Sequence, residues 1–121
     1  MLEAQVLGFV QPDLSKAGGI TESLKIAAMA SCHGLSVNPH TSATAINMAT
    51  SISFMCAIDN PGYFEADLTA YNPFRDQLTN TLPYVLDADG CVTALDGIGM
   101  GLVIDEKFVA AHPLIDGPCY V

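Results

Sequence analysis

Three ionisable residues, each at the end of a short apolar run, could act together as an acid–base site: Asp13, His40 and Glu65. An aspartate beside a histidine holds one imidazole tautomer and favours the protonated ring, which makes the histidine a competent general base. A glutamate that is desolvated and kept neutral can donate a hydrogen bond to an oxyanion. Taken alone, each has a plainer interpretation, as a turn aspartate, a loop histidine and a surface glutamate. Asp67 competes with Glu65 because the two share one face of the run.

The apolar runs predict three buried strands, over residues 6–13, 35–40 and 63–68. Segments of helical character separate them, so the order is strand, helix, strand, helix, strand. This order with short connections predicts parallel pairing, which places the ends of all three strands at one edge. Side chains at adjacent strand ends, ~4.8 Å apart, can then reach one another. We therefore expect an α/β fold in which the strand ends bring the acid and the base together.

Two helices connect these strands. The first is expected to take Thr21 as its N-cap and to stop at Gly34. The second is expected to take Thr41 or Ser42 as its N-cap and to stop at the Asn-Pro-Gly sequence of residues 60–62. Its apolar residues recur at the spacing of one buried helical face, namely Ala45, Met48, Ala49, Ile52, Met55 and Cys56.

The character of the chain changes after residue 69. We divide it into residues 1–69, which carry the strands and helices, and residues 70–121, which form a wrapping extension. Turn-forming residues punctuate the extension. Residues 86–94 predict a hairpin around an Asp-Gly turn, and residues 105–111 predict a short helix.

Composition excludes several classes of partner. The 121 residues are half apolar and only 14% charged, which suits one domain with a buried core. The formal net charge of -9 argues against nucleic acid and against an anionic membrane surface. The four cysteines lack zinc spacing, and a disulfide framework is not expected. The two that fall in apolar helical stretches, Cys32 and Cys56, are expected to behave as small hydrophobes. Since there is neither a ~20-residue apolar span nor a signal-like N-terminus, a cytoplasmic protein is expected.

Three further charged or titratable residues are weaker candidates. Lys16 lies three residues beyond Asp13 and is a candidate substrate contact, although a solvated lysine is the plainer interpretation. His33 precedes Gly34 at a helix end, where a histidine suits the helix dipole, so a structural role is expected. His112 precedes a proline in the extension and has no partner that the sequence identifies.

Two other motifs do not support a function. Ser42 and Ser53 fall in predicted helical stretches without the G-x-S-x-G turn of a serine hydrolase. The glycine-rich residues 97–101 lack the third-glycine spacing and the following helix of a dinucleotide site.

Longer strings of the sequence resemble a known family. QPDLSKAGGITESLKIAAMASCHGLSVNPH, followed by a helix and by YFEADL, resembles the enolase superfamily, and within it the mandelate racemase/muconate lactonizing group. The later string DADGCVTALDGIGMGLVIDEKFV is similar to the end of those enzymes, so the resemblance runs from about residue 6 onward. It implies the C-terminal portion of a TIM-like (β/α)7β barrel, with the three predicted strands as its sixth, seventh and eighth.

The resemblance also implies residue roles. Muconate-lactonizing relatives carry a lysine where this chain has Asp13, whereas Asp13 with His40 on the next strand matches the mandelate racemase-like subgroup, which includes acid-sugar dehydratases. By this resemblance, His40 removes the proton α to a carboxylate and Asp13 orients it. Glu65 hydrogen-bonds the enolate-like intermediate. In a dehydratase, His40 could also protonate the departing hydroxyl.

The resemblance implies Mg2+ as the cofactor, with three acidic ligands on the third, fourth and fifth barrel strands. Those strands, a lysine base on the second strand and an N-terminal capping domain have no counterpart in this sequence. We therefore expect the 121-residue chain alone to be inactive. A three-stranded sheet also leaves open edges and an uncovered face, which predicts self-association or pairing with the missing barrel portion.

Three functions follow as alternatives. The first is a C-terminal piece of a magnesium-dependent enzyme that dehydrates an acid sugar, with a hydroxy-carboxylate as substrate. The second is a racemase or epimerase like mandelate racemase, which begins with the same proton abstraction. The third is a non-catalytic remnant that serves as a structural or oligomerising module.

Overall fold

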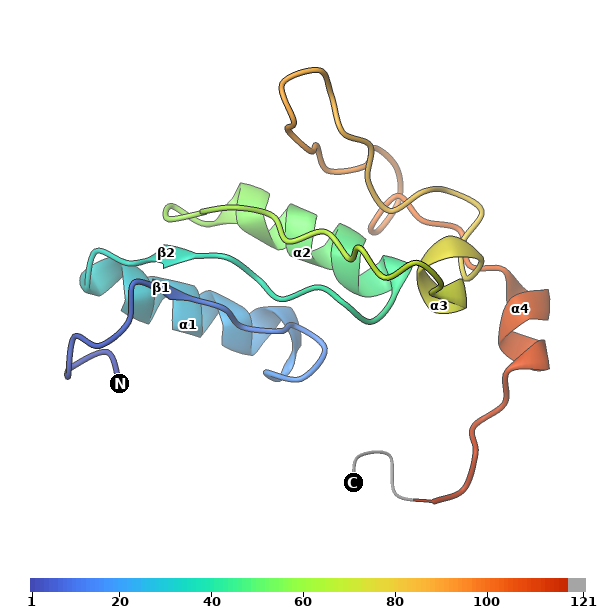
Figure 1. Cartoon of the computed structure of the whole chain (residues 1–121), viewed down its shortest axis with the longest axis horizontal. Helices are drawn as coiled ribbons and strands as arrows, with labels where there is room; N and C mark the ends of the chain where they lie inside the picture. Colours follow the sequence, from blue (N-terminus) through green and yellow to red (C-terminus); the bar gives the residue numbers. More distant parts are fainter. Residues whose placement is uncertain (118–121) are drawn as a thin grey trace.

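The computed structural model describes residues 1–117, and Figure 1 shows their arrangement. A strand–helix unit repeats once, and two short helices lie in the part of the chain that follows. The elements in chain order are β1 (Phe9–Val10), α1 (Gly19–Cys32), β2 (Ser36–Val37), α2 (Ala45–Ala57), α3 (Pro73–Asp76) and α4 (Glu106–Ala111).

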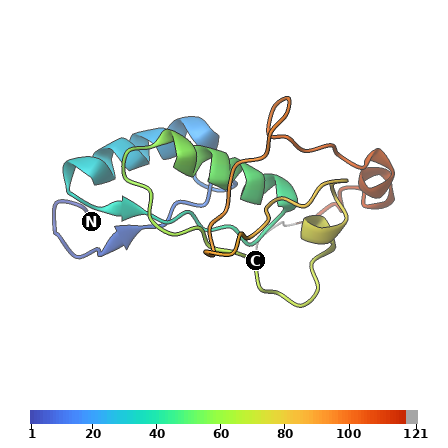
Figure 2. The same cartoon turned by 90° about the horizontal axis from the view of Figure 1, so that it is seen from above.

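The two strands pair in parallel, as the alternation of strands and helices predicted. Phe9 lies opposite Ser36, and Val10 lies opposite Val37. Figure 2 shows that α1 and α2 cover the same side of the strand layer. Because side chains alternate along a strand, Val10 and Val37 point to the helices while Phe9 points to the uncovered side.

The core lies between the strands and the helices. Its buried members are Leu14, Ala27 and Ala30 with Val37 and Phe54. Small residues on α1 allow close approach to β2, and Phe54 of α2 fills the space beside them. In the described part of the chain, Cys32 and Cys56 are exposed free thiols, so the prediction that they pack as small hydrophobes is wrong. Both lie at the ends of helices, beyond the buried turns.

Backbone geometry sets both ends of α1. Gly18 adopts a left-handed conformation with φ of 97°, and the helix begins at Gly19, so the predicted Thr21 cap is wrong. At the other end Gly34 has φ of 67°, a value that glycine adopts without strain. The N–H groups of Gly34 and Leu35 donate to the carbonyls of Ser31 and Ala30, at 2.9 and 3.0 Å, which is a Schellman end. The stop predicted at Gly34 is confirmed, and His33 is the C-cap residue.

Helix α2 begins later than expected. Its N-cap is Thr44, whose hydroxyl accepts a hydrogen bond from the Asn47 N–H at 3.1 Å, rather than Thr41 or Ser42. Any of the small polar residues at 41, 42 and 44 could cap a helix, and the buried face decides among them. That face includes Ala45, Met48, Ala49 and Ile52, as the spacing predicted, whereas Met55 is half-buried.

The third predicted strand, over residues 63–68, is wrong. Pro61 makes a parallel bridge to Val37, and the Gly62 N–H donates to the Val37 carbonyl at 2.9 Å, but no strand follows. The next residue that would face this segment is Pro39, which has no N–H to donate. The part of the chain over residues 1–69 is therefore a βαβα unit with an irregular final segment, rather than βαβαβ.

The extension folds at the end of the molecule where α2 begins (Figure 1). Helix α3 packs against α2, and an antiparallel bridge joins Thr79 to Ile104. The predicted hairpin is present as a bridge between Leu86 and Val92, and the predicted short helix is α4.

Aromatic contacts hold α3 to α4. The rings of Phe74 and Phe108 meet edge to face with centroids 5.4 Å apart, and His112 stacks on Phe108 at 4.1 Å. Nδ1 of His112 lies 2.8 Å from the Phe108 carbonyl oxygen, which gives that histidine a structural role. In residues 1–117 no helix is long and apolar enough to cross a membrane.

Candidate active site

Asp13 is the most heavily hydrogen-bonded side chain at the strand ends. Its Oδ1 accepts hydrogen bonds from the backbone N–H and the hydroxyl of Ser15, at 2.9 and 2.6 Å, and lies 3.4 Å from the Asn47 amide nitrogen. Its Oδ2 accepts from the Lys16 ammonium and from Nδ1 of His40, both at 2.8 Å. The residue is only 9% exposed, so donors rather than water satisfy the carboxylate.

These donors keep Asp13 ionised. Burial by itself would raise its pKa, since it disfavours the charged form. The hydrogen bonds from Lys16, Ser15 and His40 outweigh burial and hold the pKa of the carboxyl well below its usual range. Asp13 is therefore a carboxylate at neutral pH and acts only as an acceptor toward its neighbours.

His40 is aligned by both its backbone and its ring. The backbone N–H donates to the Pro12 carbonyl at 3.2 Å, which places the residue beside the end of the first strand run. Because the Asp13 carboxylate carries no proton, Nδ1 of His40 is the donor in their 2.8 Å contact. Nε2 of the neutral ring is then the acceptor, and the ring is 39% exposed. An imidazole in this state can take up a proton at Nε2.

Lys16 pairs with Asp13, and nearly half of its side chain is exposed. Its Nζ lies 2.8 Å from Oδ2 of Asp13, the oxygen that also faces His40. The Lys16 ammonium and a protonated His40 would therefore both be stabilised by the negative charge of the Asp13 carboxylate. The substrate contact predicted for Lys16 stays a prediction, since nearly half of the side chain is exposed.

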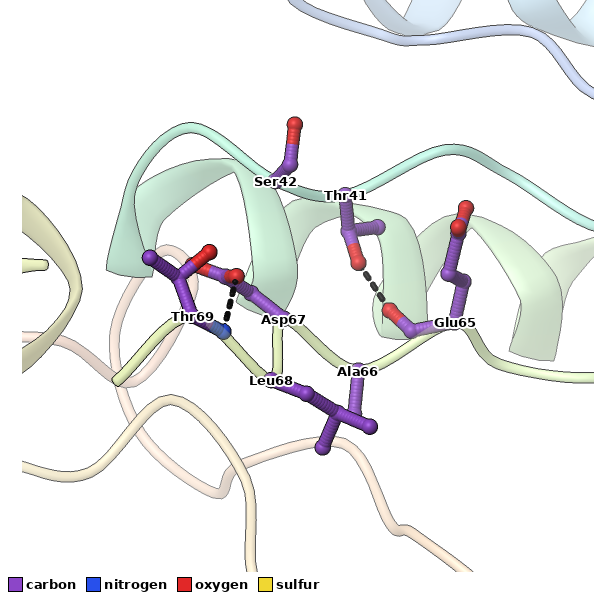
Figure 3. Close-up of a pocket in the computed structure, with 7 residues that line it drawn as sticks. All are labelled: Thr41, Ser42, Glu65, Ala66, Asp67, Leu68 and Thr69. Atoms are coloured by element: carbon purple, nitrogen blue, oxygen red, sulfur yellow. Dashed lines mark hydrogen bonds between the residues drawn. The ribbon is translucent and has the colours of Figure 1, made fainter. Parts of the chain in front are cut away.

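Glu65 lies in a different setting from the one predicted. It lines a pocket of about 270 Å³ whose other walls are Thr41, Ser42, Ala66, Asp67, Leu68 and Thr69. Figure 3 shows this pocket, in which the buried Thr41 hydroxyl donates to the Glu65 main-chain carbonyl. The residue is exposed, so the desolvated surroundings expected for its carboxyl are absent. No hydrogen bond joins that carboxyl to Asp13 or His40 among residues 1–117. Desolvation of Glu65 would require further barrel strands around it, and the described chain forms only one side of a barrel mouth.

Asp67, the competing candidate, has a structural role. Its carboxylate accepts hydrogen bonds from the Thr69 N–H at 2.9 Å and from the Asn72 amide at 2.7 Å. The Arg75 guanidinium lies 3.4 Å away. Burial would raise the pKa of Asp67, but these donors and the positive charge of Arg75 lower it.

Arg75 and Asn72 of the extension connect two segments of the site, and neither was predicted as a site residue. Arg75 Nη1 donates to the carbonyls of Asp67 and Thr69, both at 2.9 Å. The Asn72 amide also lies 3.4 and 3.3 Å from the carbonyl oxygens of Ser42 and Ala43. The start of the extension thus fixes the loop after His40 against the segment that carries Glu65. Only the Asn-Pro pair at 72–73, a helix-start signal, pointed to this contact.

Ser42 was also missed as a site residue. Its hydroxyl oxygen lies 3.2 Å from Nε2 of His40, on the opposite side of the ring from Asp13. Ser42 was predicted to lie in a helical stretch, whereas it lies in the loop before Thr44. The sequence signal for this contact was that Ser42 lies only two residues after His40.

The described residues do not fit a magnesium site by themselves. No group of three or more His, Cys, Asp or Glu side chains that could hold a metal ion occurs in residues 1–117. Asp13 and Asp67 are engaged by donors from their own chain, and Glu65 is the exposed carboxylate in the pocket lining. The chain alone therefore supports acid–base and hydrogen-bonding roles.

Comparison with known proteins identifies the class. Residues 1–108 match the family described as "Enolase C-terminal domain-like", in its mandelate racemase/muconate lactonizing branch. The match covers most of the chain, so this chain belongs to that family of the enolase superfamily, as the sequence resemblance predicted.

Individual relatives agree with this assignment. D-galactarolactone cycloisomerase of Agrobacterium fabrum is 37% identical over 95% of this chain and 32% of its own length. D-galactonate dehydratase of Xanthomonas euvesicatoria is 36% identical over 85% of this chain and 28% of its own. This chain thus spans about a third of the length of these curated relatives.

Solved structures give the same result. A crystal structure of an enolase superfamily member from Polaromonas sp. JS666 is 48% identical, with a TM-score of 0.87 over all of this chain and 31% of its own. A mandelate racemase/muconate lactonizing enzyme from Sulfitobacter sp. is 33% identical, with a TM-score of 0.79 over 97% of this chain and 28% of its own. The chain therefore has the fold of one portion of the enolase C-terminal barrel domain.

Proposed function

We propose that this chain supplies the acid–base wall of an enolase-superfamily active site, in which His40 removes the proton α to a carboxylate. The observation that carries the proposal is the 2.8 Å contact between Nδ1 of His40 and Oδ2 of Asp13 at the strand ends. Asp13 fixes the tautomer that leaves Nε2 as the proton acceptor and supports the imidazolium that forms.

The proposed reaction is dehydration of an acid sugar. Two kinds of curated relative bear the names of acid-sugar enzymes, a dehydratase and a cycloisomerase. After the α proton has moved to His40, the hydroxyl on the neighbouring carbon leaves, and His40 can return its proton to that hydroxyl. The net reaction loses one water and leaves an enol that becomes a keto acid.

Glu65 and Lys16 have proposed supporting roles. We assign Glu65 the hydrogen bond to the enolate oxygen, because it lines the pocket that begins at Ser42 beside His40. Lys16 would meet the substrate carboxylate with the exposed part of its side chain. Magnesium, expected from the superfamily, would be held by residues outside this chain. The chain alone is accordingly expected to be inactive toward acid sugars.

A chimaera tests the proposal. The segment of the Xanthomonas D-galactonate dehydratase that matches this chain, 28% of that protein, is replaced by this chain. Exchange of the α proton with deuterium and dehydration of D-galactonate are then measured. We expect His40→Asn to lower the exchange rate by ~10²-fold or more, the usual contribution of a general base. Asp13→Asn should lower it as well.

His112→Asn is the matched control, since that histidine stacks on Phe108 in the extension, outside the pocket. An active chimaera whose exchange survives His40→Asn would contradict the proposal. So would turnover of acid sugars by the isolated chain with magnesium, because the site would then be complete without the rest of a barrel. Exchange without loss of water would favour the racemase or epimerase alternative.

A further inference from the structure

Three side chains form a hydrogen-bonded line at the strand ends: a carboxylate, an imidazole and a hydroxyl. Oδ2 of Asp13 lies 2.8 Å from Nδ1 of His40, and Nε2 of the same ring lies 3.2 Å from the hydroxyl oxygen of Ser42. A base that touches a hydroxyl on one side and an orienting carboxylate on the other is the arrangement that activates a serine nucleophile. Such an arrangement is defined by geometry and not by sequence order.

We propose that Ser42 is a nucleophile activated by His40 and Asp13, and that it accepts acyl groups from activated carboxylic esters. This activity is separate from the proposed enolate chemistry, because it requires neither a metal nor a residue outside this chain. It uses Nε2 of His40 toward a hydroxyl of the protein and not toward a carbon acid of the substrate.

Ser42 is accessible where a serine nucleophile must be. It is exposed, and it forms part of the wall of the 270 Å³ pocket that Figure 3 shows. Figure 3 shows the Ser42 hydroxyl pointing away from the side chains of Ala66 and Leu68. Asn72 holds the loop from the other side through the Ser42 carbonyl, at 3.4 Å, so the hydroxyl can react without the loop losing its support.

His40 and water supply every proton transfer that the reaction needs. The Ser42 oxygen attacks the ester carbonyl, and its proton passes to Nε2 of His40. The bond from the carbonyl carbon to the leaving group then breaks, and a phenolate departs without needing a proton. The imidazolium of His40 then releases its proton to solvent. Neutral again, His40 takes a proton from water as the water attacks the acyl-serine, and it returns that proton to the Ser42 oxygen as the carboxylic acid leaves. An activated ester is the fitting substrate class because its leaving group is stable as an anion and needs no general acid to protonate it.

Two reagents test the proposal on the whole 121-residue chain. The first is p-nitrophenyl acetate, with release of p-nitrophenolate followed in the absence of metal. The second is a fluorophosphonate, which forms a phosphorus–oxygen bond to an activated serine as fluoride leaves. We expect Ser42→Ala and His40→Asn each to reduce ester hydrolysis at least ~10-fold, since general-base help is worth that much or more.

Ser53→Ala is the matched control, because Ser53 lies on α2 beyond its first two turns and should leave hydrolysis unchanged. Fragment-ion mass spectrometry of the labelled wild-type chain locates the phosphonate, and this result does not depend on how any variant folds. Label on Ser42 supports the proposal. Label elsewhere, no label, or equal hydrolysis by wild type and a folded Ser42→Ala chain would overturn it, the last because the imidazole would then attack the ester directly.

Discussion

His40 follows Asp13 by 27 residues, the same separation that relates the paired residues of β1 and β2. Asp13 and His40 thus lie three residues beyond the last pair of the strands and keep the same register. Their 2.8 Å contact is a direct outcome of strand register, and it needs no special loop conformation.

The ion pair between Asp13 and Lys16 predicts an acid-sensitive stability. The pKa of Asp13 is lowered on folding, so the unfolded chain binds more protons near pH 4. The stabilisation is present above the ordinary pKa of an aspartate, about 3.9, and is lost as the pH falls toward the lowered folded value. Lys16→Met removes one lowering contact. We expect lower stability at pH 7 and a shallower fall below pH 4, measured by urea unfolding at several pH values.

Lys25→Met is the matched control for that experiment. Lys25 also pairs three residues away, with Glu22 at 2.6 Å, but both side chains are at least half exposed. Exposed pairs contribute little to stability. Equal effects of the two substitutions would contradict the role assigned to the Asp13 pair.

Gly62 is predicted to be intolerant of any side chain. A Cβ at this position would collide with the Asn38 side-chain oxygen, which accepts a hydrogen bond from the Tyr63 N–H at 3.0 Å. Gly62→Ala should therefore displace Asn38 and loosen the start of the segment that leads to Glu65. Faster hydrogen exchange at the Tyr63 amide is the expected result. Gly8→Ala, where an added Cβ meets nothing within 4 Å, should leave that amide unchanged.

Arg75 is predicted to hold the wall of the pocket in place. It donates to the carbonyls of Asp67 and Thr69 and pairs with the Asp67 carboxylate. Arg75→Met should lower the melting temperature and speed hydrogen exchange over residues 67–70. Arg75→Lys should recover only part of the loss, because an ammonium cannot reproduce the planar fork of donors. Full recovery by lysine would mean that charge alone matters.

The open side of β1 predicts self-association. Phe9 is 47% exposed on a strand that pairs only with β2 in the described chain. An uncovered apolar sheet face and an unpaired strand edge both tend to associate with another chain, and a lysine on the strand opposes that association. Phe9→Lys should shift the chain toward monomer in sedimentation experiments over a range of concentrations. Ile98→Lys, at a fully exposed loop residue, should not, and a wild-type chain that stays monomeric would refute the prediction.

The features that could be predicted from the sequence are those that depend on residues close together in the chain. The apolar spacing of α2 and the glycine at the end of α1 depend on a few neighbouring residues. The glycine stop was right, and the spacing was right from Ala45 to Ile52 but not for the exposed Cys56. The parallel pairing of β1 and β2 followed from the order of elements. The resemblance in Asp13 and His40 then pointed to two side chains that the structure does bring into contact.

The failures depend on contacts between distant segments. Burial of Glu65 requires neighbouring strands that the described chain does not provide, so its apolar flanks were misleading. The third strand was lost because Pro39, on another segment, cannot donate to it. Asn72 gained its role only when the extension folded back onto the loop after His40, whereas the contact of Ser42 with His40 is local and was missed because Ser42 was predicted to lie in a helix.

Register also determines which changes in chain length the site can tolerate. A residue inserted between α1 and β2, or near Ala17 before α1, lengthens a connection and leaves the pairing of Val10 with Val37 intact. One residue inserted between Val10 and Asp13 would turn the carboxylate to the opposite side of the run, away from the imidazole. Homologous chains should therefore vary in length around α1 and keep a fixed count of residues from each strand to its acid or base.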